Sequence, residues 1–189
     1  MKIIDDVFPT QFQEYLEKFF TSDNLPWYMD ELTADHSNAS LDKYTEDSFH
    51  FCHVFIKNEQ INSQHWANIQ AIIQWLILKE NISIKSVLRA KANLTFTNKN
   101  YNYKNHLPAH IDTPPNTVAL TAIYYINDSD GDTIFFKNQE NPNDELEEIS
   151  RVSPKKGRLV LFDCNTLHAG CLPEKTTRRY VLNLNFATS

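Results

Sequence analysis

The stretch SVLRAKANLTFT, residues 86–97, alternates apolar and polar side chains. Its apolar positions are Leu88, Ala90, Ala92, Leu94 and Phe96, and its polar positions are Arg89, Lys91, Asn93 and Thr95. Successive side chains of a β-strand point to opposite faces, so this pattern predicts a strand with one face on a core and the other face polar.

Further strands are predicted downstream of this stretch. They cover residues 117–127, 132–137, 158–163 and 179–186, and a glycine-ended turn, residues 128–131, links the first two. No helical pattern separates them. Short strands in succession favour an antiparallel sandwich or barrel over a parallel sheet.

The first third of the chain has a helical period. Phe12, Tyr15, Leu16, Phe19 and Phe20 form one apolar stripe, and a second stripe is made by Trp66, Ile69, Ile73 and Leu76. Residues 49–56 form a predicted strand. The Asn-rich loop that contains Tyr101, Tyr103 and Lys104 is predicted to be a mobile flap, and His106 is expected in a solvated loop. We expect one domain over residues 1–189, with residues 1–83 as helical support and residues 84–187 as the β core.

The composition limits the class of protein. The chain has 189 residues, a formal net charge of -6 and three glycines far apart. An acidic chain is unsuited to binding a phosphate backbone, so a nucleic-acid partner is not expected. The glycines exclude a phosphate-cradling loop. Three cysteines without a CxxC pair indicate neither a disulfide framework nor a zinc site.

The beginning of the chain carries Asp5 and Asp6 where a signal peptide has a basic flank and an apolar run. No apolar stretch approaches the ~18 residues of a membrane-spanning helix. We therefore expect a cytoplasmic protein without a membrane partner.

The candidate chemistry begins with His110 and Asp112. In an extended segment, residues two apart point to the same side, so an imidazole and a carboxylate converge. His168 follows a predicted strand and a turn. Two histidines and one carboxylate on one face of a metal leave three open positions, which suits Fe(II) and oxygen chemistry, whereas zinc usually takes four ligands.

Two adjacent arginines open the last predicted strand, and they must face opposite ways. Arg178 shares its side with apolar residues, whereas Arg179 shares its side with Val181, Asn183 and Asn185. Polar groups on a core strand need partners or a liganded cavity. We therefore expect Arg179 to hold the remote carboxylate of a co-substrate that chelates the metal through two atoms.

The order His110-x-Asp112, His168 and Arg179 resembles the 2-oxoglutarate/Fe(II)-dependent dioxygenases, and most closely their prolyl-hydroxylase-like branch, which includes small phage and bacterial members. The resemblance covers roughly residues 84–187 and also rests on the motifs RAKANL (89–94), TAIYYIN (121–127), GRLVLF (157–162) and RYVLNLNF (179–186).

This resemblance implies a double-stranded β-helix, a jelly-roll or cupin-like barrel, buttressed by the N-terminal helices. It implies Fe(II) on His110, Asp112 and His168, with 2-oxoglutarate and O2 as co-substrates, and hydroxylation of a C–H bond with release of succinate and CO2. It also implies that Thr121 and Tyr125 contact the co-substrate carboxylate. Asn93 lies on the polar face of its predicted strand and could line the same pocket.

Two other functions are compatible with the sequence. One is a non-catalytic small-molecule or peptide binding module on the same barrel, and the other is an oxygenase without 2-oxoglutarate, in which Arg179 would lack a role. The substrate stays open among a peptidyl proline, a free amino acid, a metabolite and a modified base. The oligomeric state stays open as well.

Overall fold

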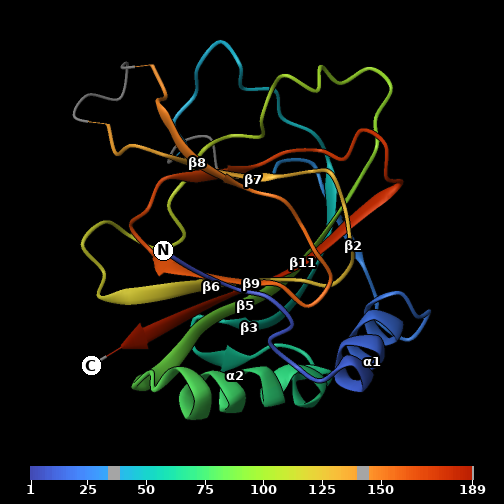
Figure 1. The fold of residues 1–189 in the computed structure, drawn as a ribbon, viewed down its shortest axis with the longest axis vertical. Coiled ribbons are helices and arrows are strands. Elements are labelled where there is room, and N and C mark those ends of the chain that lie inside the picture. Colours follow the sequence, from blue (N-terminus) through green and yellow to red (C-terminus); the bar gives the residue numbers. More distant parts are fainter. Residues whose placement is uncertain (34–38, 140–144, 189) are drawn as a thin grey trace.

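Two antiparallel sheets face each other in the computed structural model of the protein, which describes residues 1–33, 39–139 and 145–188 (Figure 1). The larger sheet contains β1 (Lys2–Ile4), β2 (Tyr28–Asp30), β3 (His50–Lys57), β4 (Gln60–Ile61), β5 (Ile84–Phe96), β6 (Ala119–Tyr125), β9 (Leu159–Asp163) and β11 (Arg178–Thr188). Its strand order is β1-β9-β6-β11-β5-β3-β2, with β4 paired to β3.

The smaller sheet has the order β10-β7-β8, with bounds His168–Gly170, Thr133–Phe136 and Glu148–Val152. Every pairing within the two sheets is antiparallel. The predicted mainly β class is confirmed, and the facing sheets form the predicted double-stranded β-helix.

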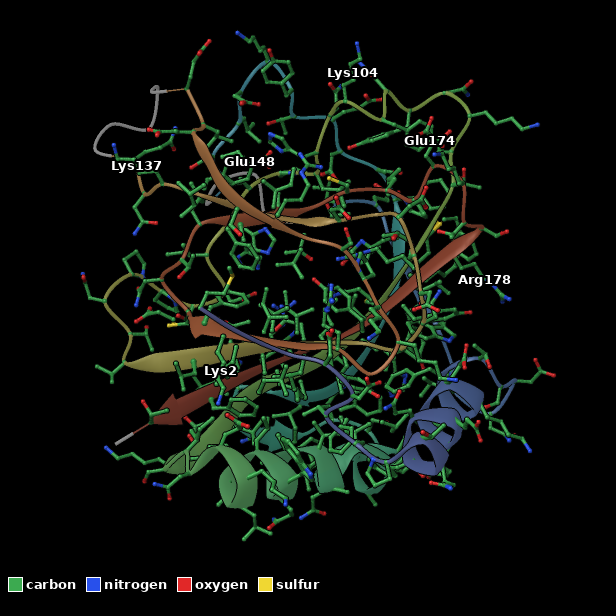
Figure 2. The ribbon with its side chains drawn as sticks, in the orientation of Figure 1. Lys2, Lys104, Lys137, Glu148, Glu174 and Arg178 are labelled. Carbon is green, nitrogen blue, oxygen red and sulfur yellow. The ribbon has the colours of Figure 1, made fainter. Side chains whose placement is uncertain are left out.

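Strand β11 lies between β5 and β6 in the larger sheet. Its register sets Arg179 opposite Thr95, Asn183 opposite Lys91 and Asn185 opposite Arg89. The polar positions of the two longest strands therefore form one continuous polar face, which is turned toward the smaller sheet. Figure 2 shows side chains filling the space between the sheets, whereas Arg178 extends outward at the end of β11.

The opposite, apolar face of the larger sheet is covered by α1 (Thr10–Phe20) and α2 (Trp66–Glu80) (Figure 1). Phe20, Ile69 and Leu76 of these helices are fully buried against Leu182 and Leu184 of β11, in one core cluster. Burial of this apolar surface holds the helices on the sheet. The predicted helical support is confirmed, but the first third also supplies β1, β2, β3 and β4 to the sheet.

The Asn-rich loop predicted to be a mobile, solvated flap is anchored to the rest of the protein by buried side chains. Tyr101 is 5% exposed and packs with Leu107 and Leu172. His106 is 5% exposed, packs against the Phe136 ring with the two ring planes tilted, and places its Nε2 atom 3.4 Å from a carboxylate oxygen of Asp42. The many asparagines of this loop predict exposure to solvent, but Tyr101 and His106 between them are buried. Composition alone therefore gives the wrong prediction of exposure.

Neither helix in the part of the chain that the structure describes has the length and apolar character needed to cross a membrane. The longer helix, α2, has 15 residues. The three cysteines, Cys52, Cys164 and Cys171, are free.

Replacement of Leu184 by alanine is expected to lower the free energy of unfolding by about 2–5 kcal/mol, because Leu184 is completely buried on the central strand. Urea denaturation measures this change. The matched control is Leu78→Ala on α2, where the side chain is 80% exposed and the expected change stays within about 0.5 kcal/mol. Equal losses in both variants would contradict this position of the core.

Candidate metal centre and its cavity

The main chains of His110 and His168 pair with each other as an isolated antiparallel bridge. The N–H of His110 donates to the carbonyl oxygen of His168 at 2.9 Å, and the reciprocal hydrogen bond is 3.1 Å long. Their ring centroids are consequently 4.9 Å apart. Two histidines that are far apart in the sequence are thus fixed side by side by the backbone.

Asp112 completes a cluster with the two histidines. One of its carboxylate oxygens lies 3.9 Å from Nε2 of His110, and the other lies 3.6 Å from Nε2 of His168. One ligand atom from each of the three residues lies within 4.8 Å of the others. This spacing is compatible with a single metal ion between them, as the HxD spacing predicts.

Both imidazole rings are oriented by backbone carbonyl oxygens. Nδ1 of His110 is 3.0 Å from the carbonyl oxygen of Pro108, and Nδ1 of His168 is 3.0 Å from that of Thr166. A carbonyl oxygen can only accept, so each Nδ1 carries the proton and each Nε2 presents its lone pair to the cluster. This is the arrangement in which protein histidines bind metals.

The Asp112 carboxylate is fully buried and held from three sides. The hydroxyl of Thr121 donates to it at 2.8 Å, the amide of Asn183 donates at 3.1 Å, and the Arg89 guanidinium lies 4.0 Å away. Burial disfavours the charged form, but the Arg89 guanidinium and the hydrogen bond from Thr121 favour it, and the pKa of Asp112 is lowered. The carboxylate therefore stays ionised.

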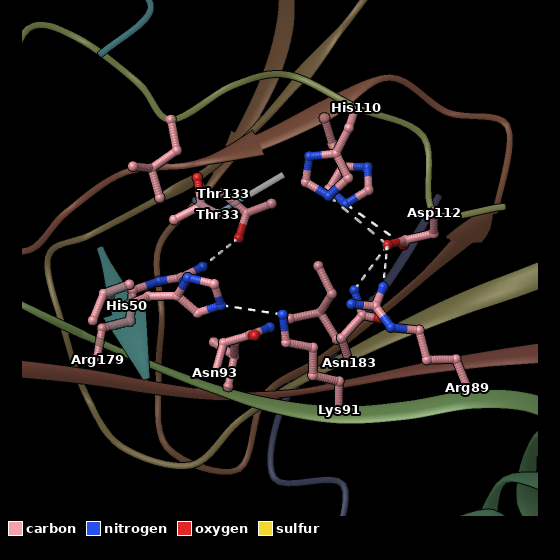
Figure 3. A pocket seen from close by; sticks show the side chains of 16 residues that line it. Thr33, His50, Arg89, Lys91, Asn93, His110, Asp112, Thr133, Arg179 and Asn183 are labelled. Atoms are coloured by element: carbon pink, nitrogen blue, oxygen red, sulfur yellow. Dashed lines mark hydrogen bonds and ion pairs between the residues drawn. The ribbon is translucent and has the colours of Figure 1, made fainter. Parts of the chain in front are cut away.

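A cavity opens beside this cluster between the two sheets, with an empty space of about 660 Å³ including its mouth (Figure 3). Arg179 lies in its wall, 5% exposed. Its Nη2 donates to the Thr133 hydroxyl at 2.9 Å, and Thr133 also accepts a 2.7 Å hydrogen bond from Tyr125. Among the described residues, no carboxylate lies within 4.0 Å of this guanidinium.

Gly131 leaves room for Arg179. A Cβ atom at residue 131 would lie 2.9 Å from Cδ of Arg179 and 2.6 Å from the carbonyl oxygen of Cys171. Any larger residue would displace the arginine or the chain. Glycine is therefore required at residue 131, because the backbone there lies close to Arg179 in the cavity wall.

Several buried atoms of the cavity wall lack a hydrogen-bond partner among the residues that the structure describes. They are Asn93 Oδ1, Asn183 Oδ1, Thr95 Oγ1, His50 Nδ1 and Arg179 Nε. A buried polar atom without a partner costs about 1–3 kcal/mol. A concentration of such atoms beside an arginine without a carboxylate fits a cavity that receives a polar, anionic molecule.

A second cluster of possible ligands is formed by Asp30, His50 and Cys52. Here the Lys91 ammonium lies 3.1 Å from Nε2 of His50 and 3.9 Å from the Asp30 carboxylate. The Lys91 ammonium therefore already lies beside these possible ligands, where it would repel a metal ion. In the cluster at His110 the neighbouring cation, Arg89, lies 4.0 Å from Asp112, and both imidazole Nε2 atoms keep their lone pairs, so this cluster is the better candidate metal centre.

The structure brings together five of the residues expected from the sequence: His110, Asp112, His168, Arg179 and Asn93 all line the cavity. Tyr125 lies behind Thr133. Thr121 is fully buried beside Asp112, where its hydroxyl is donated to the carboxylate. The hydroxyl that contacts Arg179 belongs to Thr133, which is not among the residues predicted from the sequence. In the sequence, the position of Thr133 is indicated only by the predicted strand 132–137, in which Thr133 and Phe135 point to the same face.

Residues 96–187 match the family model described as 2OG-Fe(II) oxygenase superfamily. This match contains the histidine pair, Asp112 and Arg179. The chain carries a 2OG-Fe(II) oxygenase domain. The oxygenase family uses Fe(II), 2-oxoglutarate and O2, so the resemblance seen in the motifs is confirmed.

Solved structures support the fold of this oxygenase. A 2OG-Fe(II) oxygenase family oxidoreductase from Burkholderia pseudomallei is 11% identical with a TM-score of 0.65, covering 98% of this chain and 84% of that one. A Pseudomonas putida prolyl-4-hydroxylase is 14% identical with a TM-score of 0.55, covering 100% and 92%.

A third similar structure is the Trichoplax adhaerens prolyl hydroxylase in complex with a hypoxia inducible factor oxygen degradation domain peptide. It is 14% identical, with a TM-score of 0.58 and coverage of 99% of this chain and 83% of that one. The comparison with curated proteins found no sequence match.

The metal-free oxygenase is expected to lose stability as the pH falls from about 6.5 to 4. Burial and the charge of Lys91 lower the pKa of His50 from 6.5 to about 4, and burial and His168 lower that of His110 to about 4. Between these values the unfolded chain binds more protons than the folded chain, so the free energy of unfolding decreases as the pH falls.

Urea denaturation with a chelator at several pH values measures this dependence. Because His50→Gln removes one of the two imidazoles, its stability should fall less steeply over the same pH range. A variant with the same slope as the wild type would show that His50 is not held neutral in the folded state.

Proposed function

We propose that this oxygenase hydroxylates a C–H bond of its substrate, with His110, Asp112 and His168 holding Fe(II) and Arg179 holding 2-oxoglutarate. The observation that carries the proposal is the convergence of two imidazole Nε2 atoms and one carboxylate beside a buried arginine without a carboxylate partner. Two nitrogen ligands and one oxygen ligand on one side of a metal match the facial set that non-heme Fe(II) oxygenases use.

When bound, Fe(II) and 2-oxoglutarate supply the oxygen chemistry, in which O2 is consumed, 2-oxoglutarate is converted to succinate and CO2, and one oxygen atom enters the C–H bond. The chain supplies ligands, orientation and a water-poor cavity. Thr121 and Asn183 each donate a hydrogen bond to Asp112, which fixes the plane of the carboxylate that faces the metal.

Arg179 is suited to the remote carboxylate of 2-oxoglutarate. A guanidinium offers two parallel donors to a carboxylate, and this one is buried with Nε unpaired. Tyr125 and Thr133 form a hydrogen-bonded chain that ends on the guanidinium. We assign Thr133, with Tyr125 behind it, to positioning Arg179, and Thr121 to positioning Asp112; Asn93 is assigned to the co-substrate pocket.

The whole chain is proposed to act as one domain, because β1, β2 and β3 from the first third pair into the same sheet as β5, β9 and β11. The substrate is proposed to be a small molecule or a peptide, in keeping with the peptide complex of the Trichoplax adhaerens enzyme. A cytoplasmic location stays part of this proposal.

The experiment is succinate release by the ferrous protein with 2-oxoglutarate and O2. Turnover of 2-oxoglutarate, including slow turnover without substrate, should disappear in His110→Ala and His168→Ala. In Arg179→Met, activity should be recovered only at a 2-oxoglutarate concentration raised about tenfold or more, because a charge-assisted bidentate contact is lost.

The control variant is Arg178→Met, which removes the neighbouring guanidinium on the outward face and should leave the turnover and the KM for 2-oxoglutarate unchanged. Unchanged succinate release in both histidine variants would defeat the proposal. A wild-type protein that binds 2-oxoglutarate with Mn(II) but releases no succinate would favour the non-catalytic binding module instead.

A further inference from the structure

The cavity contains two cationic side chains that iron and 2-oxoglutarate do not explain. Arg89 and Lys91 occupy alternate positions of β5, on the same polar face as Asn93, and both line the cavity. We propose that the substrate is a small organic acid and that Arg89 and Lys91 bind its carboxylate. This inference rests on the metal and 2-oxoglutarate sites of the proposed function.

Lys91 is a buried ammonium with incomplete charge compensation. It is 7% exposed, and its Nζ donates to Nε2 of His50 at 3.1 Å. His50 is a neutral acceptor, so it satisfies one hydrogen bond but not the charge. The only described carboxylate within 4.0 Å is that of Asp30, at 3.9 Å with its side chain 48% exposed to solvent. A buried charge normally has a close counter-ion, and here a bound anion would supply it.

Arg89 loses its partner when the metal site is filled. Its one acidic neighbour within 4.0 Å, among the described residues, is Asp112, at the outer limit of that distance. A metal ion on Asp112 would take up the negative charge of that carboxylate. The Arg89 guanidinium, 39% exposed toward the cavity side of β5, would then face the substrate space without a counter-ion.

The co-substrate is not the expected partner of these two residues. Figure 3 shows Arg179 and Arg89 at opposite ends of the pocket, with Lys91 on the wall between them. A molecule that chelates the metal and extends to Arg179 occupies the Arg179 end. The anion for Arg89 must therefore come from a second molecule.

The cavity wall is positively charged, whereas the chain as a whole is negatively charged. The protein has a net charge of -6, yet the described residues of the wall include the cations Arg89, Lys91 and Arg179 and one carboxylate, Asp112. A cleft lined by one sign of charge concentrates ligands of the opposite sign. Lys91 is also too deeply buried for the side chain of a folded protein partner to reach, which favours a free acid.

The test uses the protein loaded with Mn(II) and saturating 2-oxoglutarate, and a matched pair of probes, N-acetylglycine and its neutral amide, N-acetylglycinamide. Relaxation of the acetyl protons by Mn(II) reports binding near the metal without any turnover, with the Zn(II) protein as the blank. The acid should bind at least about tenfold more tightly than the amide, because the neutral amide cannot form charged hydrogen bonds with Arg89 and Lys91.

Lys91→Met and Arg89→Met should each weaken the binding of N-acetylglycine by about tenfold or more, and Lys91→Arg and Arg89→Lys should restore most of it, which separates the charge from the packing. The matched controls are Lys85→Met, exposed on the same strand, and Arg178→Met; both should bind N-acetylglycine as the wild type does.

Equal binding of the acid and the amide, or unchanged binding of the acid in Lys91→Met and Arg89→Met, would overturn the inference. Calorimetric titration of 2-oxoglutarate onto each Mn(II) variant keeps the two proposals apart. Affinity for 2-oxoglutarate should fall in Arg179→Met and stay within about threefold of wild type in Lys91→Met, since Lys91 does not make the charged contact. An equal fall in Lys91→Met would assign this lysine to the co-substrate and overturn its role toward the substrate. A wild-type protein that fails to bind 2-oxoglutarate would instead contradict the proposed function.

Discussion

The pairing of the His110 and His168 backbones is the constraint on which the rest of the site depends. Two reciprocal hydrogen bonds, 2.9 and 3.1 Å long, fix the separation of the rings. The bridge is itself held because β10, which begins at His168, pairs with β7 in the smaller sheet. The position of the imidazoles is therefore a property of the sheet, and not of a mobile loop.

Asp112 connects this histidine pair to the larger sheet. Its carboxylate accepts hydrogen bonds from Thr121 on β6 and Asn183 on β11, while its neighbours on the other side are the two histidines. The cluster thus joins the two sheets at one point. Groups that are preorganised in this way need little rearrangement when a metal ion binds.

The polar face of β5 and β11 is costly for folding and useful for binding. Partnerless atoms of Asn93, Thr95 and Asn183 and the buried cations Lys91 and Arg179 occupy positions that apolar residues would fill in a purely structural barrel. The opposite face of the same strands is the main apolar core. Residues that violate the rules of core packing are expected where function requires them.

The alternation in residues 86–97 and 179–186 was sufficient to predict both the strands and their faces. The choice of Arg179 over Arg178 follows from it, because only one of two adjacent residues can face the cavity. The HxD spacing likewise predicted a converging pair. These are local consequences of the strand period, and they do not require knowledge of the tertiary structure.

Other features depend on contacts between distant segments, and the sequence could not reveal them. Thr133 on β7 contacts Arg179 on β11, and Thr121 on β6 donates to Asp112, only in the folded protein. The contact of His106 with Asp42 is likewise between segments far apart in the sequence. The pairing of Arg89 with the metal-binding carboxylate is also a tertiary contact, so the cationic character of the substrate space emerged only from the structure.

The most direct measurement is anomalous X-ray diffraction at the manganese edge from crystals grown with Mn(II) and 2-oxoglutarate. One peak is expected at about 2.0–2.3 Å from Nε2 of His110, Nε2 of His168 and a carboxylate oxygen of Asp112, with the co-substrate extending from it to Arg179. A peak at Asp30, His50 and Cys52, or a site at which the two histidines do not share one ion, would contradict the assignment.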